Sequence, residues 1–494
     1  MNRQLRHVAV ASLLLLAALI VATTYWQTWA VGSLADRQDN AIALVARLTV
    51  DRGKILGGGT VLAANHKHRK RGLTIFTRYY PTGDLAPQVV GYSTAAGTTT
   101  GLEQSLDDYL TGANTNLSNT LSQELDKLGG KTVHGDDAIL TLRPAVQRLA
   151  LQELAGRCGA VVAMDAKTGA IYAMASSPTY DPNLIQQPNG FARITRIKGT
   201  CGDASALVNN ATAGLYPPGS TFKMVTAAAA LDSGAFTPSS SFNDPGYCIE
   251  YGQHVSNAGN PDQNGPESFG NVTLSQGFEH SINSVFCNVG KQIGGEEILR
   301  YAKRFGFYSI PPLELPPTSS LPSGLYKNGR LFDPSSESQI DPGRLAFGQF
   351  SMLATPLQMA MVAQTIANGG AEMQPHLVDR ILAPDGSLVS RTRPSVLGHP
   401  IKPQTAAELN QMMQLVVQGG TGTSAQIPGI EVAGKTGTAE LGLGTVYDAW
   451  FVSFAPANNP RYVVAAVVEK QPNGFGGSIS APIAKAILEK LLGR

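Results

Sequence analysis

The chain has 494 residues, a formal net charge of +2 at pH 7 and 43% apolar residues. Domains usually contain roughly 100 to 200 residues, so we expect two folded domains and room for a further segment. The small net charge and the lack of a charged tail exclude a protein that recruits nucleic acid through a basic field.

The first predicted element is a transmembrane anchor at residues 8–29. The chain carries no charge from Val8 to Ala35. An apolar run of about 19 residues can cross roughly 30 Å of hydrocarbon as a helix. Arg3 and Arg6 precede the run and aromatic residues follow it, which predicts a cytoplasmic N-terminus at residues 1–7 and an extracytoplasmic remainder. A cleaved signal peptide is the alternative, but no Ala-x-Ala site follows the run closely.

Residues 30–140 are predicted to form a small, separate, non-catalytic module. They mix helical and strand patterns, with loops at Gly57–Gly59 and Thr98–Thr100. Because this module lies between the anchor and the larger part of the chain, we expect a pedestal that also docks a partner. A bare spacer is the alternative.

Residues 141–494 are predicted to form an α/β domain, with helices packed against an antiparallel sheet. Two apolar runs around a polar turn after Gly159 indicate a β-hairpin, and strand patterns recur near the C-terminus, so both ends of the domain should share one sheet. The later strands are predicted at Glu431–Glu440, Asp448–Ala455 and Arg461–Lys470. Helices are predicted at Ser220–Asp232, Leu274–Ile293, Pro356–Asn368 and Pro482–Leu492.

The four cysteines, Cys158, Cys201, Cys248 and Cys287, allow three complete pairings, and an exported location would permit disulfides. The sequence does not choose among the pairings. For Cys287, within a predicted helix, a buried free thiol is at least as reasonable an expectation as a bridge. No cysteine or histidine spacing is typical of a metal site, so we expect neither a metal nor a cofactor.

Ser220 and Lys223 form the first chemical pattern, in the run Tyr-Pro-Pro-Gly-Ser-Thr-Phe-Lys. A serine hydroxyl needs a base within hydrogen-bond reach to become a good nucleophile at neutral pH. The Pro-Pro-Gly sequence stops the chain just before good helix formers, which predicts Ser220 on the first turn of a helix. Residues three apart share a helix face, so the Lys223 amine should lie beside the Ser220 hydroxyl.

Lysine acts as a base only when its pKa falls well below about 10.4, which burial and a second cation can both achieve. Lys435 is the candidate second cation, in a predicted strand with Thr436, Gly437 and Thr438. Such a strand could hold a substrate carboxylate, and the amides of Thr438 and Ser220 could form an oxyanion hole.

Ser281 and Asn283 form the third pattern, on a predicted helix. Ser281 could relay a proton between Lys223 and the leaving amine, and Asn283 could hydrogen-bond a peptide carbonyl of the substrate. Each serine pattern alone arises by chance about once or twice in a chain this long. A second Lys-Thr-Gly at Lys167–Gly169 falls in the predicted hairpin turn, where it needs no function. Only the ordered combination of the three patterns builds a cleft with a nucleophile, a base, a relay and an anion holder.

With these patterns, the chain resembles a class B penicillin-binding protein, and its short N-terminal module is most similar to the actinobacterial penicillin-binding protein A group. The resemblance covers nearly the whole chain. Three motifs of the family match Ser220–Lys223, Ser281–Asn283 and Lys435–Thr438, and its N-terminal signature matches Asp51–Ile55 and Gly101–Glu103.

The resemblance implies a penicillin-binding, serine β-lactamase-like transpeptidase domain with an α-helical subdomain. It implies D-alanyl-D-alanine transpeptidation that cross-links peptidoglycan stem peptides through a serine acyl-enzyme, with covalent inhibition by β-lactams. Only about 110 residues separate the anchor from the catalytic domain, too few for a glycosyltransferase domain, so a membrane partner would polymerise the glycan strands.

The nearest rival function is hydrolysis, by a DD-carboxypeptidase or a β-lactamase. Rapid deacylation requires a water activator, and no Glu-x-x-Leu-Asn run lies between Ser281 and Lys435. A rival of another class is an inactive sensor or scaffold that binds wall fragments, and the three intact patterns argue against it.

Overall fold

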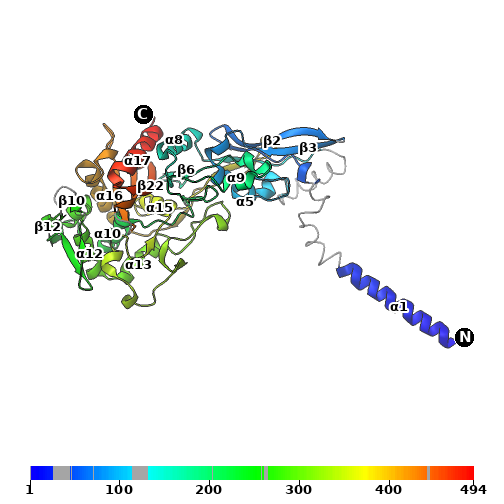
Figure 1. The fold of residues 1–494 in the computed structure, drawn as a ribbon, viewed down its shortest axis with the longest axis horizontal. Coiled ribbons are helices and arrows are strands. Elements are labelled where there is room, and N and C mark those ends of the chain that lie inside the picture. Colours follow the sequence, from blue (N-terminus) through cyan, green and yellow to red (C-terminus); the bar gives the residue numbers. More distant parts are fainter. Residues whose placement is uncertain are drawn as a thin grey trace.

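The structure, a computed structural model of the chain, describes residues 2–25, 45, 47–70, 72–113, 132–202, 204–257, 259–260, 265–441 and 445–494. Its first helix, α1 (Asn2–Thr24), lies apart from the folded body (Figure 1). The segment Arg6–Thr24 has a mean hydropathy of 2.2, so this helix is long and apolar enough to cross a membrane, and none of the segment is buried in the folded body. Positions 26–29 of the predicted anchor lie outside the described residues.

A six-stranded sheet, in the order β18-β17-β4-β1-β2-β3, forms the N-terminal module. Only the β1–β4 pair is parallel. Two of the strands, β17 and β18, come from beyond residue 140, which the local sequence pattern did not indicate. The strands are β1 (Ile55–Gly57), β2 (Thr60–Lys70), β3 (Leu73–Tyr79), β4 (Asp137–Leu140), β17 (Val378–Leu382) and β18 (Leu388–Arg391). The division of the chain at residue 140 stays a prediction.

A buried ion-pair network joins the two parts of the N-terminal signature of this module, through Arg52 and Glu103. The Glu103 carboxylate is fully buried and accepts hydrogen bonds from Arg78 Nε at 2.5 Å and from Arg52 Nη2 at 3.0 Å. Two guanidinium groups thus compensate one carboxylate away from water, which a buried charge requires. The short helices of this region are α4 (Pro87–Val90), α5 (Gly101–Ser105) and α6 (Asp107–Leu110).

A five-stranded antiparallel sheet, in the order β20-β21-β22-β5-β6, forms the centre of the larger domain. This arrangement confirms that strands from both ends of the domain share one sheet. The strands are β5 (Gly159–Asp165), β6 (Ile171–Ser177), β20 (Ala433–Glu440), β21 (Val446–Ala455) and β22 (Tyr462–Pro472).

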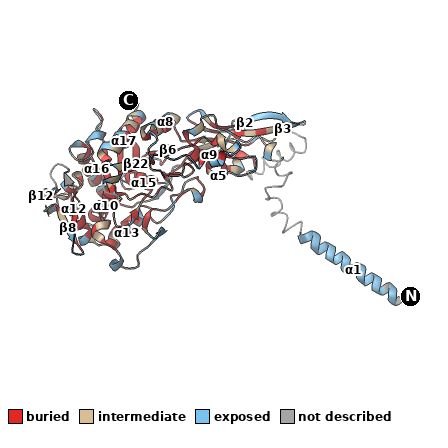
Figure 2. Cartoon of the chain, in the orientation of Figure 1, coloured by how far each residue is buried: buried red, intermediate tan, exposed pale blue. Residues whose placement is uncertain are grey.

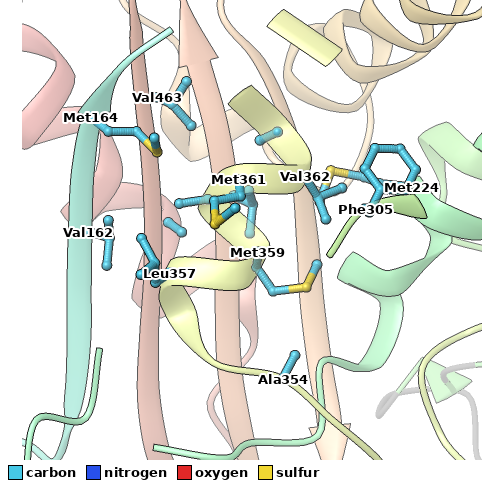
Figure 3. Packing of buried hydrophobic residues seen from close by; sticks show 14 of the residues in the cluster. Val162, Met164, Met224, Phe305, Ala354, Leu357, Met359, Met361, Val362 and Val463 are labelled. Carbon is cyan, nitrogen blue, oxygen red and sulfur yellow. The ribbon is translucent and has the colours of Figure 1, made fainter. Parts of the chain in front are cut away.

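Helices cover both faces of this sheet, and the alternation of side chains along β5 shows why. Val161 packs with α8 (Pro144–Leu154) and α17 (Gly476–Leu492), whereas Val162 packs on the opposite face against α15 (Pro356–Ala367). Figure 3 shows Val162 and its neighbours beside the apolar residues of α15. Because helices cover both faces, the strands are apolar almost throughout. Figure 2 shows that these strands are buried.

A mainly helical subdomain packs beside α10 (Lys223–Asp232). The sequence predicted one helix over Leu274–Ile293, and this prediction was wrong, because the structure has two helices with a break between them. The remaining helices are α9 (Gly190–Ile194), α11 (Leu274–Glu279), α12 (Asn283–Ile293), α13 (Gly295–Arg304), α14 (Pro342–Leu345) and α16 (Pro403–Gln418).

Within the described residues, the remaining short strands form four pairs and one three-stranded sheet. They are β7 (Ser241–Asp244) with β12 (Gly270–Thr273), β8 (Tyr247–Glu250) with β9 (Gln253–Ser256), β10 (Gly259–Asn260) with β11 (Gly265–Pro266), β13 (Gly324–Lys327) with β14 (Arg330–Leu331) and β15 (Met352–Leu353), and β16 (Glu372–Met373) with β19 (Val396–Gly398).

All four cysteines form disulfides, Cys158–Cys201 and Cys248–Cys287. The expectation that Cys287 is as well explained by a free thiol was wrong. Its partner lies on β8, which pairs with β9 and packs against α12. The helical spacing around Cys287 describes only its own helix, so it contains no information about that neighbour.

Candidate active site

Ser220 lies in a 3₁₀ turn, Gly219–Phe222, and the α-helix begins only at Lys223. The prediction that Ser220 lies on the first turn of an α-helix was therefore wrong in one respect, because that turn is a 3₁₀ turn that precedes the α-helix. The turn is closed by Thr221, whose amide and hydroxyl both donate to the Pro218 carbonyl, at 3.2 and 2.7 Å. A hydrogen bond from an amide to the carbonyl three residues earlier is typical of a 3₁₀ helix, and here it holds Ser220 just before the start of α10.

Two glycines let the nucleophile turn approach strand β20 closely. Gly219 has a φ of +50°, and a Cβ there would lie 3.1 Å from the Thr438 carbonyl oxygen. A Cβ on Gly437 would lie 2.8 Å from the Pro218 carbonyl oxygen. The Trp450 indole N–H donates to the Pro217 carbonyl at 2.9 Å and fixes the turn from the neighbouring strand. The Ser220 hydroxyl and the edge of β20 are thereby brought together.

Lys223 is fully buried, and its amine points at Ser281 and Asn283, the second of the three family motifs. Its Nζ donates to the Ser281 carbonyl at 2.6 Å, to Asn283 Oδ1 at 2.9 Å and to Ser281 Oγ at 3.3 Å. Within the described residues no hydrogen bond joins this amine to the Ser220 hydroxyl, so the predicted contact is not formed in this state. Burial, together with the charge of Lys435, holds the pKa of Lys223 well below its usual value.

Ser281 lies in the break between α11 and α12, not within a helix as predicted. It has a φ of +59°, and Asn283 is the first residue of α12. In a continuous helix the Ser281 carbonyl would accept from the amide four residues later, but the break leaves it to accept from Lys223. The broken helix therefore supplies the lysine with a carbonyl acceptor that an intact helix would not offer.

Lys435 contacts the same serine from strand β20. Its fully buried Nζ donates to Ser281 Oγ at 2.9 Å and to the Thr436 carbonyl at 3.1 Å, and burial lowers the pKa of Lys435 to about 7. The Thr436 hydroxyl lies 2.5 Å from that of Thr421, while Thr438 Oγ1 accepts from the Gly476 amide at 3.3 Å. Two lysines thus converge on one hydroxyl, an arrangement that favours a neutral amine on at least one of them.

We expect Lys435→Met to stabilise the fold by about 1 to 2 kcal/mol while weakening acylation, since it removes a buried amine that forms no ion pair with a carboxylate of the described residues. Thermal unfolding measures the first effect and labelled-penicillin binding the second. Lys167→Met is the matched control, because Lys167 belongs to the other Lys-Thr-Gly and is exposed. A lower melting temperature for Lys435→Met than for the control would contradict the argument.

Asp244, at the end of β7, is a site residue that the sequence did not reveal. Its carboxylate is 1% exposed and accepts from the Gly246 amide at 2.8 Å, Asn257 Nδ2 at 2.8 Å, the Phe269 amide at 2.9 Å and the Ser284 hydroxyl. The Asp-Pro-Gly sequence resembles an ordinary turn, so no local signal distinguishes it.

The groups bound to Asp244 orient the second motif. Asn257 Oδ1 accepts from the Ser284 amide at 2.9 Å, at the start of α12. The preceding carbonyl, that of Ser256, accepts from Asn283 Nδ2 at 3.1 Å. The amide of Asn283 is therefore held at both ends, by this loop and by Lys223.

Asp244→Asn is expected to lower the acylation rate about tenfold and stability by about 2 to 3 kcal/mol, since an amide nitrogen cannot accept the donors that the carboxylate oxygen accepts. Stopped-flow measurement with fluorescent penicillin and chemical denaturation test both effects. Asp385→Asn is the control, because Asp385 only caps the exposed turn to Ser387. Unchanged acylation in Asp244→Asn would show that Asn283 does not depend on this carboxylate.

Residues 159–489 match the family described as the penicillin binding protein transpeptidase domain, and residues 52–138 match the penicillin binding protein A dimerisation domain. The chain belongs to the penicillin-binding protein transpeptidase family. This confirms the resemblance that the motifs indicated, including the similarity to penicillin-binding protein A.

Named relatives extend over the whole chain. It is 33% identical to the peptidoglycan D,D-transpeptidase PbpA of Mycolicibacterium smegmatis, over all of this chain and 99% of that protein. The ceftriaxone acyl-enzyme of penicillin-binding protein A from M. tuberculosis has a TM-score of 0.79 and 32% identity, covering 90% of this chain and 99% of the other. A D,D-transpeptidase domain from Eggerthella lenta has a TM-score of 0.75 and 35% identity, covering 90% and 99%. The penicillin-binding fold predicted for the larger domain is thus confirmed.

Proposed function

We propose that the protein is a peptidoglycan D,D-transpeptidase that cross-links stem peptides through an acyl-enzyme on Ser220 and is acylated there by β-lactams. The observation that carries the proposal is the convergence of Lys223 and Lys435 on the Ser281 hydroxyl, beside the turn that holds Ser220. Relatives named as D,D-transpeptidases, and similar structures described as β-lactam acyl-enzymes, support the same chemistry.

In the acylation step, Ser220 Oγ attacks the carbonyl carbon of the peptide bond between the two terminal D-alanines. Neutral Lys223 accepts the hydroxyl proton, and the amides of Ser220 and Thr438 stabilise the oxyanion of the tetrahedral intermediate. When this intermediate collapses, the C–N bond breaks and the proton passes through Ser281 to the leaving amine.

The substrate is held by groups on either side of the nucleophile. Protonated Lys435, with the hydroxyls of Thr436 and Thr438, binds the terminal carboxylate, and Gly437 lets the peptide approach the strand. Asn283 donates to a peptide carbonyl. In the second step the amine of another stem peptide attacks the acyl carbon, Ser220 leaves as the alcohol, and the amine proton returns through the same groups.

The same proposal places the chain in the cell membrane. Residues 1–7 lie in the cytoplasm, α1 crosses the bilayer once, and the domain from residue 141 works outside, next to the wall. Residues 30–140 form the pedestal, and a separate membrane protein polymerises the glycan strands. The exposed apolar surface of α1 and the disulfides, which persist in oxidising compartments, support this location.

The full-length protein in detergent, incubated with penicillin, tests the proposal by mass spectrometry. We expect one stable adduct per chain, and cross-linked product when a stem-peptide thioester is supplied with an amine acceptor. Turnover of penicillin many times per second would instead indicate a hydrolase, and failure to attach any penicillin would indicate an inactive scaffold.

A further inference from the structure

The strands β2 and β3 extend as a two-stranded ribbon beyond the N-terminal sheet. β2 pairs with β1 only over Thr60–Ala63, whereas its pairing with β3 continues to Lys70. We call residues 66–70 and 73–77 the basic ribbon. Figure 1 shows it at the end of the folded body, and Figure 2 shows its outer part exposed.

The basic ribbon carries an unbroken row of basic side chains, Lys67, His68, Arg69 and Lys70, all exposed. The sequence contains no acidic residue between Asp51 and Asp84. Within the described part of the chain, no carboxylate forms an ion pair with Lys67, Arg69 or Lys70, unlike surface lysines such as Lys303, which pairs with Asp333. The positive charge of the ribbon is therefore not compensated by any of the described residues.

Protection of the sheet edge explains only part of this surface. Beyond Ala63 both β2 and β3 are edge strands, so cations on β2 can prevent pairing with another chain, but edge protection requires no exposed apolar side chain at the tip. Across from them, Leu73 faces Lys70 and Ile75 faces His68, and Leu73 is 48% exposed. The tip thus combines cations with an exposed apolar side chain, the combination found in segments that bind membrane interfaces.

The ribbon also lies where the chain joins the folded body. Arg47 and Leu48, the first described residues after the anchor apart from Val45, line one cavity together with Asn65 and Phe76 at the base of the ribbon. From that base the ribbon runs five more residues, about 17 Å at strand spacing. Its tip therefore lies about that distance along the ribbon from the cavity that Arg47 and Leu48 line.

We propose that the tip of the basic ribbon binds anionic phospholipid headgroups of the membrane that anchors the chain, an inference that rests on the anchor in the proposed function. Lys67 and Arg69 point to one face of the ribbon and His68 and Lys70 to the other, because side chains alternate along a strand. Cations on both faces suit a headgroup layer that surrounds the tip, whereas a protein surface would contact one face. The second attachment restricts the tilt of the body above the bilayer.

The full chain in lipid nanodiscs tests this inference. Thr74→Cys introduces the single free thiol, because the four native cysteines are bonded in pairs. A fluorophore attached to this thiol is quenched when the tip of the ribbon contacts brominated lipids. We expect quenching in discs that contain phosphatidylglycerol, and its loss in pure phosphatidylcholine or at high salt. Arg69→Gln with Lys70→Gln should lower the ratio of docked to free ribbon about 30-fold, or about fivefold for each charge.

Lys327→Gln with Arg330→Gln is the matched control, since it removes two exposed cations from another hairpin, β13–β14. It should leave the quenching unchanged, and both double variants should react with penicillin at the native rate. Equal quenching in the two kinds of disc, or equal loss in both double variants, would overturn the inference. A chain that does not enter the discs contradicts the anchor itself, whereas a chain that enters without quenching contradicts only the ribbon.

Discussion

Ser220→Ala is expected to abolish the covalent penicillin adduct and to lower peptide cross-linking roughly a millionfold, since removal of an acylated nucleophile leaves only binding and polarisation. The Ser220 side chain forms no hydrogen bond with other described residues, so the fold should be unaffected. Mass spectrometry of the full-length protein after incubation with penicillin measures the adduct.

Ser233→Ala is the matched control for this variant, because Ser233 follows the far end of α10 and its hydroxyl donates to the carbonyls of Ala229, at 2.6 Å, and Ala230, at 3.3 Å, within the same helix. That variant should keep the full adduct. A penicillin adduct that persists in Ser220→Ala, or one that disappears in Ser233→Ala, would move the nucleophile to another residue.

Lys223→Met should lower the rate of acylation by about 10² to 10⁴-fold, the usual contribution of a positioned general base. The methionine side chain is similar in length to that of lysine and is apolar, so it fills the same buried space. Rapid mixing with a chromogenic β-lactam gives the rate. Lys291→Met removes a partly exposed cation from the last turn of α12, the helix that begins at Asn283, and should acylate at the native rate.

The pH dependence separates the two lysines. The free amine of Lys223 predominates above its lowered pKa, so the second-order acylation rate should rise as the pH increases through that value. Lys435 is protonated below about pH 7 and loses its charge above it, so carboxylate binding, and with it the rate, should fall above about pH 7. The second-order rate reports the free enzyme, and a bell-shaped profile results.

Lys435→Met provides the test of this assignment. The descending limb should disappear, and the ascending limb should move to higher pH, because the pKa of Lys223 is no longer lowered by a neighbouring cation. A profile in Lys435→Met that keeps the native descending limb would assign that limb to another group.

Local patterns were sufficient for the parts of the protein whose cause is local. The apolar run predicted the helix that the structure shows as α1, and the two apolar runs and the polar turn after Gly159 predicted β5 and β6. The second Lys-Thr-Gly lies in their turn as predicted, where Asp165 Oδ1 accepts from the Lys167 and Thr168 amides. These features depend on neighbours within a few residues, which the sequence displays directly.

The candidate site was predicted in composition but not in geometry. All of the predicted motifs meet at one place, yet Lys223 points at Ser281 and Asn283 instead of Ser220. Helix propensity around Ser281 favours a continuous helix, but in the structure the helix is broken there, and the Ser281 carbonyl and hydroxyl bind lysines from two other elements. Such contacts join residues far apart in sequence, and no periodicity encodes them.

By itself the sequence determined the apolar N-terminal helix, the shared sheet of the larger domain and the family, because each has a local pattern or an ordered set of motifs. Only the tertiary structure decided that Ser220 sits in a 3₁₀ turn, that Cys248 pairs with Cys287, and that Asp244 organises the second motif. The physical reason is the same in each case. Their energies come from contacts between distant segments, which exist only once the chain has folded.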